Sequence, residues 1–224
     1  MSAPNGRYFS PEQARRAYDR IGRLQDAQTL YEHRATEELL SYGGFERARA
    51  VFELGLGTGA LARRLFERRL PPSARYAGVD LSPRMLRLAR GRFRRWEGRV
   101  ELRLVDGSLP LDFAAGAFDR FVASYVLDLL SPDDIRAVLA EAHRLLSPEG
   151  SLCLTSLTPG TTPLSRTVTT SWQAVWSRRP ALVGGCRPLE LLEHVDVRSW
   201  AIDHRAVVTS FGVSSEVIVA TRRP

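Results

Sequence analysis

The sequence contains no lysine, so each of its 32 basic side chains is an arginine. Nothing in protein chemistry requires guanidinium groups alone, and we interpret the absence as the codon preference of a GC-rich genome. The net charge of +7 is therefore weak support for a nucleic-acid partner.

Cysteines, long apolar runs and targeting segments are also scarce. The two cysteines, Cys153 and Cys186, match no zinc or redox spacing and do not make a disulfide framework. The longest apolar stretch, Phe121–Leu130, contains Asp128 and is far shorter than the roughly 18 residues of a membrane span. No apolar run follows Met1, so we expect no secretory signal and a cytoplasmic location.

The remaining composition is that of an ordinary globular protein. With 224 residues, 44% hydrophobic and 25% charged, the chain is long enough to bury one core. No internal repeat is visible. We therefore predict a single domain, built from an N-terminal helical cap (1–44), a core (45–157), a lid or substrate segment (158–192) and a terminal β-hairpin (193–224).

Short apolar runs alternate with amphipathic stretches after Gly43. Two of these stretches start with Ser-Pro, as does a predicted N-terminal helix from Ser10 to about Tyr42, and serine followed by proline is typical of a helix start. Alternation of strand and helix predicts a parallel, doubly wound α/β sheet. The predicted strands cover 50–54, 76–79, 100–105, 118–123 and 151–157, and the predicted helices lie near 60–70, 83–96 and 132–146.

The C-terminal part of the chain has a different pattern. Residues 198–208 and 214–221 read as two strands joined by a short loop containing glycine. Parallel neighbours need a crossover of a dozen or more residues, so this pair is expected to be antiparallel.

A glycine-rich turn follows the first predicted strand. Glycines at a strand-to-helix turn allow positive φ and a close approach of the backbone to a ligand. The signal is ambiguous, because Gly55-x-Gly57-x-x-Ala60 also fits a dinucleotide-binding fingerprint with alanine in place of the third glycine.

Three acidic residues indicate a ligand site more specifically than the glycine-rich turn does, because each of them ends a predicted strand. Glu53, Asp80 and Asp106 are 27 and 26 residues apart, which is one strand-helix unit each. Ligands of open α/β sheets bind in the crevice outside these strand ends. Asp80 is placed to accept hydrogen bonds from ribose hydroxyls, and Asp106 from an exocyclic amine such as that of adenine. Alternatively, such acids only cap the following helix, although Ser82 already fills that role after Asp80.

At these residues the sequence resembles the class I S-adenosylmethionine-dependent methyltransferases. The matching motifs are ELGLGTG (53–59), GVDLSP (78–83), VDGSLP (105–110), FD (118–119) and LLSPEG (145–150). The resemblance implies a Rossmann-like seven-stranded sheet with the last strand antiparallel, and S-adenosylmethionine as cofactor. It further implies which residues contact that cofactor: Tyr18, Glu53, Gly55, Gly57, Thr58, Gly59, Asp80, Leu81, Met85, Asp106, Gly107 and Ser124.

Within this superfamily, residues 18–21 and 109–119 look most like the quinone-biosynthesis C-methyltransferases and the bacterial phospholipid N-methyltransferases. We therefore expect direct in-line methyl transfer to a small-molecule or lipid-like acceptor. Tyr125, Trp172 and Trp176 are candidate acceptor contacts, although the tryptophans, at i and i+4, would equally serve as lid core. No general base and no metal site can be identified.

The segment Arg84–Arg99 carries seven arginines against Glu97 alone, which is +6 of the net charge of +7. It is either a solvated helix face or a patch for an anionic surface. A buried stripe of Met85, Ala89, Phe93 and Trp96 would direct the arginines outward, away from the cofactor.

Three alternative functions remain open at this point. The arginine patch would suit an RNA methyltransferase, which should bind RNA in a salt-sensitive manner. The glycine-rich turn would suit a nicotinamide-dependent dehydrogenase, although some 45 residues precede it here. The same crevice would also suit a non-catalytic ligand-binding domain. Cytosine C5 methylation is excluded, because neither cysteine follows a proline.

Overall fold

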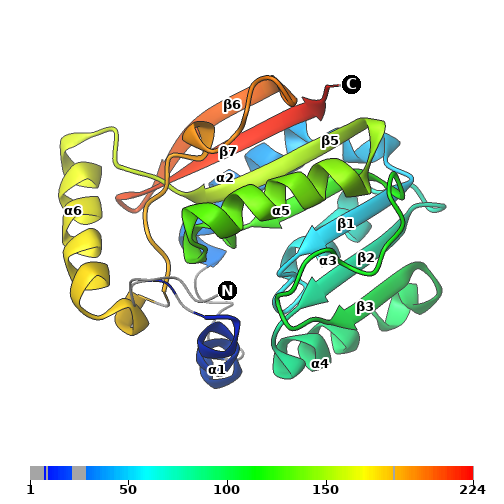
Figure 1. The fold of residues 1–224 in the computed structure, drawn as a ribbon, viewed down its shortest axis with the longest axis horizontal. Helices are drawn as coiled ribbons and strands as arrows, with labels where there is room; N and C mark the ends of the chain where they lie inside the picture. The colour runs from blue at the N-terminus through cyan, green and yellow to red at the C-terminus, as the bar shows by residue number, and fades with distance from the viewer. Residues whose placement is uncertain (1–7, 9, 22–28, 184, 224) are drawn as a thin grey trace.

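A seven-stranded sheet forms the centre of the computed structural model (Figure 1), which describes residue 8 and residues 10–21, 29–183 and 185–223. The strand order is β3-β2-β1-β4-β5-β7-β6. Hydrogen-bonded neighbours among β1 to β5 are parallel, whereas β7 is antiparallel to both β5 and β6. The predicted fold class is confirmed. The strands are β1 (Ala50–Leu54), β2 (Arg75–Asp80), β3 (Val100–Leu104), β4 (Phe118–Ser124), β5 (Leu146–Leu157), β6 (Trp200–Ser210) and β7 (Val213–Arg222).

Helices cover both faces of this sheet. In Figure 1, α5 (Pro132–Leu145) lies in front of it, and α2 (Thr29–Tyr42) and α3 (Ala60–Arg68) lie behind it. Side chains alternate between two cores: in β4, Phe121 packs with α5, whereas Val122 packs with α2 and α3. Burial on both faces explains the apolar runs 51–52, 121–123 and 152–154 of the central strands. The edge strands β3 and β6 are partly exposed and carry charged side chains. The same packing holds the C-terminal ends of the strands in place, and the candidate functional site lies at these ends.

The predicted serine caps are present at three helix starts. The Ser82 hydroxyl accepts a hydrogen bond from the Met85 amide at the start of α4 (Pro83–Arg92), and Ser131 accepts one from Asp134 at the start of α5. At α1 (Pro11–Ile21), Ser10 and Gln13 form a reciprocal capping box.

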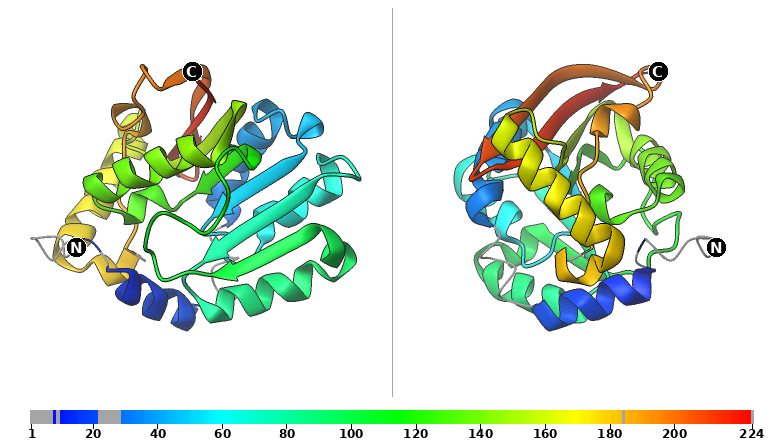
Figure 2. Two further views of the ribbon diagram at one scale, coloured as in Figure 1. Left: turned by 45° about the vertical axis from the view of Figure 1, so that its right-hand side comes forward. Right: turned by 90° about the vertical axis from the view of Figure 1, so that its left-hand side faces the viewer.

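The single N-terminal helix predicted from Ser10 to Tyr42 is wrong, because the structure has two helices there, α1 and α2. Residues 22–28 between them are outside the described residues. The two helices also contact different elements: α1 contacts α4, whereas α2 contacts β5, β6 and β7. Figure 2 shows α1 at the strand ends, away from the layer that α2 forms.

The structure also refines the predicted helix 83–96 and the predicted lid or substrate segment 158–192. The helix after β2 ends at Arg92 and is followed by a 3-10 helix, Arg94–Arg99. Met85, Ala89 and Phe93 are buried as predicted, whereas Trp96 is only partly buried. Segment 158–192 contains α6 (Pro163–Arg178), which stands beside the sheet in Figure 1. No helix in the described ranges is both long enough and apolar enough to cross a bilayer.

Candidate functional site

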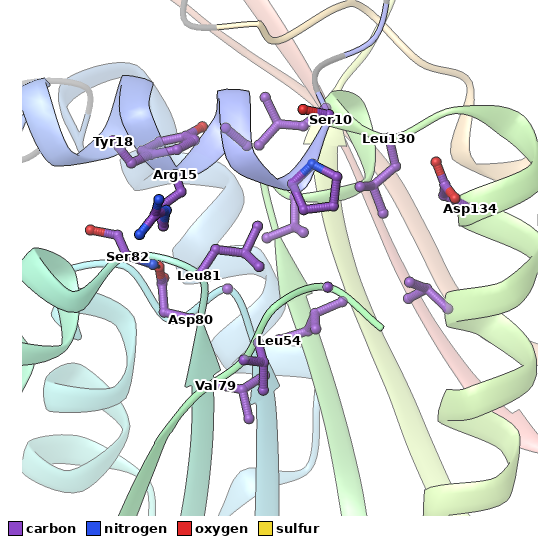
Figure 3. Close-up of a pocket in the computed structure, with 18 of the residues that line it drawn as sticks. Ser10, Arg15, Tyr18, Leu54, Val79, Asp80, Leu81, Ser82, Leu130 and Asp134 are labelled. Atoms are coloured by element: carbon purple, nitrogen blue, oxygen red, sulfur yellow. The ribbon is translucent and has the colours of Figure 1, made fainter. Parts of the chain in front are cut away.

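A cavity of about 640 Å³ opens at the C-terminal ends of the strands, beneath α1 (Figure 3). This volume lies within the range of small-molecule sites. We call it the strand-end pocket. Its walls come from five parts of the chain: α1 and the residues before it, the turn after β1, the end of β2, the loop after β3, and the segment from β4 into α5.

The glycine turn after β1 forms one wall. Gly55 and Gly57 line the pocket with φ of 65° and 55°, a region that other residues rarely adopt. A Cβ on Gly55 would lie 2.5 Å from Cγ2 of Val126, so the turn and the segment after β4 can approach each other only with glycine here. The turn is therefore fixed by the same packing that shapes the pocket.

Asp80, at the end of β2, is the acidic side chain beside this turn. Its Oδ2 accepts a hydrogen bond from the Gly57 amide (2.8 Å), and its Oδ1 accepts one from the Ser82 amide (2.8 Å). Burial raises the pKa of its carboxyl above the usual value, and the two amides oppose that rise. A carboxylate has about four acceptor positions. Asp80 therefore keeps capacity for ligand hydroxyls while it braces the turn.

Glu53 lies in the interior, outside the pocket lining. The Tyr76 hydroxyl donates to its Oε2 (2.6 Å). Burial raises the pKa of Glu53 to about 8, although the bond from Tyr76 lowers it. Glu53 therefore supports β1 and β2 under the glycine turn and does not face the cavity.

Asp106, after β3, is exposed and is not part of the pocket lining, whereas Gly107 and Ser108 are. Its Oδ1 accepts bonds from the amide and the hydroxyl of Ser108 (2.9 and 2.5 Å), which lower the pKa of the carboxyl. The Asp106 carboxylate is thus engaged in a short Asx turn with Ser108. The sequence had led us to expect this side chain at the edge of an adenine.

Helix α1 covers the pocket and is attached to the start of α4. The Ser82 hydroxyl donates to Oδ1 of Asp19 (2.5 Å), and the Arg84 guanidinium donates to the Asp19 carbonyl (2.7 Å). Tyr18 and Arg15, on the same helix, face the cavity in Figure 3. One aspartate therefore holds the lid helix against the core.

Tyr125 follows β4 with a φ of 54°, an uncommon conformation for a residue with a Cβ. Its amide donates to the Thr155 carbonyl (2.8 Å), and its hydroxyl shares a hydrogen bond with Ser215 (2.8 Å). Both Ser124 and Tyr125 line the pocket. β5 and β7 thus hold the aromatic ring at the cavity.

Trp172 and Trp176 of α6 lie outside the pocket lining. Their indole Nε1 atoms donate to the carbonyls of Cys186 and Gly185 (2.9 Å each). The Trp176 ring lies 5.8 Å from that of Tyr8, which does line the pocket. The tryptophans therefore secure residues 185–186 and support the pocket wall from outside.

Comparison with known proteins identifies this arrangement. The family model described as "Methyltransferase domain" matches residues 51–150, which include the glycine turn, Asp80 and Asp106. The chain belongs to the class I S-adenosylmethionine-dependent methyltransferases. The cofactor of this family is S-adenosylmethionine, and a cavity of this size, with a positive-φ glycine turn beside a buried carboxylate, fits it.

Two curated methyltransferases are similar over the core. Demethylmenaquinone methyltransferase of Tropheryma whipplei (strain Twist) is 35% identical over 140 residues, which are 61% of this chain and 52% of that protein. Malonyl-[acyl-carrier protein] O-methyltransferase of Laribacter hongkongensis is 30% identical over 162 residues, 69% of this chain and 53% of that protein. The chain thus spans about half the length of these relatives.

The solved structure of the [4+2]-cyclase SpnF matches with a TM-score of 0.72 over 96% of both chains, at 17% identity. At that identity the likeness shows the fold alone. The RNA-methyltransferase and dehydrogenase alternatives are not favoured by the comparisons.

The predicted cofactor residues fall into two groups in this methyltransferase domain. Eight of the predicted site residues line one cavity: Tyr18, Gly55, Gly57, Asp80, Leu81, Gly107, Ser124 and Tyr125. The others lie outside that lining: Glu53, Thr58, Gly59, Met85, Asp106, Trp172 and Trp176. Their roles remain predictions.

Several pocket residues were not anticipated from sequence. Tyr8, Pro11 and Arg15 come from the N-terminal cap, and Leu109, Leu111, Leu129, Leu130 and Val138 supply apolar surface. The capping box at Ser10 located the start of α1, and the resemblance placed Tyr18 of this helix at the cofactor. No local pattern indicates which other side chains of the helix face the cavity.

Proposed function

We propose that the chain transfers a methyl group from S-adenosylmethionine to a small, largely apolar acceptor by direct in-line displacement. The observation that carries the proposal is the continuity of the strand-end pocket. One side holds the glycine turn and Asp80, and the other is lined by Pro11, Leu111 and Leu130. One cavity can therefore hold cofactor and acceptor together, and their alignment contributes on the order of 7–11 kcal/mol to lowering the barrier.

In this proposal each wall of the pocket has a distinct task. Bound S-adenosylmethionine supplies the electrophilic methyl group. The turn at Gly55 and Gly57 holds its methionine part, Asp80 accepts bonds from the ribose hydroxyls, and Leu81 packs beside the adenine. Tyr18 and Tyr125 close the pocket and exclude water.

The apolar wall favours a hydrophobic acceptor such as a quinol. Few polar side chains lie in this wall of the pocket, and the relative with 35% identity is a demethylmenaquinone methyltransferase. A malonyl thioester is the second candidate, because the other relative is a malonyl-[acyl-carrier protein] O-methyltransferase.

Thermal unfolding with S-adenosylhomocysteine, with NAD and with neither tests the cofactor. At about 100 times its dissociation constant a ligand adds about 2.7 kcal/mol, which raises Tm by roughly 5–10 °C for a domain of this size. We expect the rise with S-adenosylhomocysteine alone, and expect Asp80→Asn to reduce it.

Asp112→Asn is the matched control for that measurement, because Asp112 is exposed and outside the pocket lining. A rise with NAD, or equal rises in both variants, would contradict the assignment. Cofactor binding without methylation of any offered acceptor would favour a non-catalytic domain or another reaction on this fold.

We also propose that α4 and the 3-10 helix after it contact an anionic surface. Arg87, Arg90, Arg94 and Arg95 are exposed, and in the part of the chain that the structure describes they form no ion pair with an acidic side chain. Arg92 and Arg99, by contrast, serve the fold, because Arg92 donates to the Thr58 hydroxyl and Arg99 to the Ala74 carbonyl.

A further inference from the structure

Helix α5 presents one face to the strand-end pocket, and the part of that face within the cavity is apolar apart from one carboxylate. Leu130 precedes the helix, and Asp134, Ala137 and Val138 follow it at helical spacing, so that all four line the cavity. The inward stripe of a helix is normally apolar. Asp134 breaks this pattern, and such local exceptions are expected at functional sites.

The start of α5 holds the Asp134 side chain in place. The Ser131 hydroxyl accepts a hydrogen bond from the Asp134 amide (3.2 Å) and donates one to Asp134 Oδ2 (2.6 Å). Pro132 begins the helix, and Ile135 anchors it in the core. Within the described ranges, Asp134 Oδ1 accepts no hydrogen bond and the carboxylate forms no ion pair. One positioned oxygen is therefore available to a ligand.

Glu141, two turns further along the same face, shows what a fully engaged acid looks like here. Its Oε1 accepts hydrogen bonds from the Leu111 amide (2.8 Å) and the Arg144 guanidinium (2.6 Å), and Arg144 also donates to the Leu111 carbonyl (3.0 Å). These bonds fix the loop after β3 against α5, where Leu111 and Val138 are buried and line the pocket. Asp134 thus belongs to a rigid wall, without comparable partners of its own.

Asp134 also lies on the acceptor side of the pocket. In Figure 3, Leu130 and Asp134 lie across the cavity from Asp80 and Ser82, where the proposed function places the ribose of the cofactor. Arg15 lies on the Asp80 side as well. Of the two acids among the described lining residues, Asp134 is therefore the one that an acceptor would meet.

We propose that Asp134 determines acceptor specificity by accepting a hydrogen bond from a hydroxyl group of the acceptor. The inference rests on the proposed function and narrows its substrate class to apolar compounds that carry a hydroxyl. A hydrogen bond to a carboxylate is stronger than one between neutral groups. A compound of the same shape without the hydroxyl leaves that bond unmade, and a compound with a carboxylate there is repelled.

This specificity separates the two candidate acceptors of the proposed function. A quinol carries hydroxyl groups on an apolar ring, so it can satisfy Asp134 and the leucine wall together. A malonyl group instead brings a second negative charge to a wall that holds one already. The carboxylate of Asp134 therefore favours the quinol.

The neighbouring Asp133 provides a control that differs mainly in direction. Both aspartates lie in the first turn of α5, where negative charge interacts favourably with the helix dipole. The Asp133 carboxylate is exposed, forms an ion pair with Arg136 and is not part of the pocket lining. Asparagine at either position removes the same charge from the same turn, but only at 134 does it change the pocket.

The test measures the binding of three naphthalene compounds to the protein saturated with S-adenosylhomocysteine, by calorimetric titration. 2-Naphthol carries a hydroxyl, 2-methoxynaphthalene has that hydroxyl masked, and 2-naphthoate carries a carboxylate. We expect the wild type to bind 2-naphthol about tenfold more tightly than either of the others. Asp134→Asn should lose most of this preference and bind 2-naphthoate more tightly than the wild type does, because an amide can donate to a carboxylate. Asp133→Asn should keep the wild-type affinities.

The gain of 2-naphthoate binding in Asp134→Asn is a result that damage to α5 would not produce. If that variant folds poorly, the order of affinities in the wild type still tests the proposal. Equal affinities of the wild type for the three compounds, a preference for 2-naphthoate, or the same change in both variants would overturn it. So would binding of S-adenosylhomocysteine without any binding of 2-naphthol. A wild type that does not bind S-adenosylhomocysteine would instead overturn the proposed function.

Discussion

Glu53 shows how a single buried residue ties the stability of this fold to pH. Its carboxyl is enclosed under the glycine turn, with the Tyr76 hydroxyl as its hydrogen-bond donor. Burial disfavours the charged form, so the pKa is raised to about 8 in the folded state. In the unfolded chain the same carboxyl has a pKa of about 4.3.

We predict that Glu53→Gln flattens the dependence of stability on pH between about 5 and 8. Over this range the folded state holds a proton on Glu53 that the unfolded state has lost, so unfolding releases it. The free energy of unfolding then falls as pH rises, by up to about 1.4 kcal/mol per pH unit. Glutamine has no such proton to lose.

Urea unfolding of wild type and Glu53→Gln at several pH values measures this difference directly. Glu149→Gln, at an exposed position in β5, is a control that should keep the wild-type slope. Parallel slopes in wild type and Glu53→Gln would show that Glu53 is ionised in the folded state at neutral pH.

Among the elements, α1 is the helix that covers the strand-end pocket, and polar contacts attach it to the start of α4. It contacts α4, where Asp19 accepts the bond from Ser82 and its carbonyl accepts the one from Arg84. Its outer face is charged and exposed. Elements held this way open at low free-energy cost compared with the sheet.

We predict that Asp19→Ala loosens the lid and weakens S-adenosylhomocysteine binding several-fold, while the Tm of the free protein changes little. The reason is that the lost bond holds α1 and not the sheet. Calorimetric titration and amide hydrogen exchange of residues 11–21 measure the two effects. Glu12→Ala, which removes an exposed carboxylate from the same helix, is the control and should leave the affinity unchanged.

The sequence allowed α4 and α5 to be predicted with their starts, because serine followed by proline is a local signal with a local cause. It also placed Gly55, Gly57 and Asp80 together, because parallel strands end at the same edge. It did not reveal that the Tyr18 hydroxyl meets the Cys186 thiol, or that the Tyr8 ring packs against the Trp176 ring. These pairs are far apart in the chain and depend on how α1 and α6 pack.

At the scale of the whole molecule, the excess positive charge is concentrated on one side of the sheet. The exposed arginines lie on α4 and the 3-10 helix after it, which pack beside β2 and β3 at the sheet edge. Several of the seven arginines in this stretch donate hydrogen bonds to other parts of the chain. The exposed patch therefore contains fewer arginines than the sequence implies.

We predict that the chain sediments with vesicles containing anionic phosphatidylglycerol and not with neutral phosphatidylcholine vesicles. Each arginine near such a surface contributes about 1 kcal/mol, and salt weakens the attraction. Replacing Arg87, Arg90, Arg94 and Arg95 by Gln should abolish binding. Replacing Arg63, Arg68, Arg166 and Arg178, on α3 and α6, is the charge-matched control. Preferential, salt-sensitive binding to RNA would indicate a different partner.

The position of β7 has a consequence for how the protein is made. This strand lies between β5 and β6, so residues 213–222 complete a sheet whose other members come earlier in the chain. While the ribosome is still adding them, β5 is an open edge of apolar strand and β6 has no partner. Such edges recruit other chains. Until residues 213–222 are available for pairing, this edge of a nascent molecule therefore stays open to other chains.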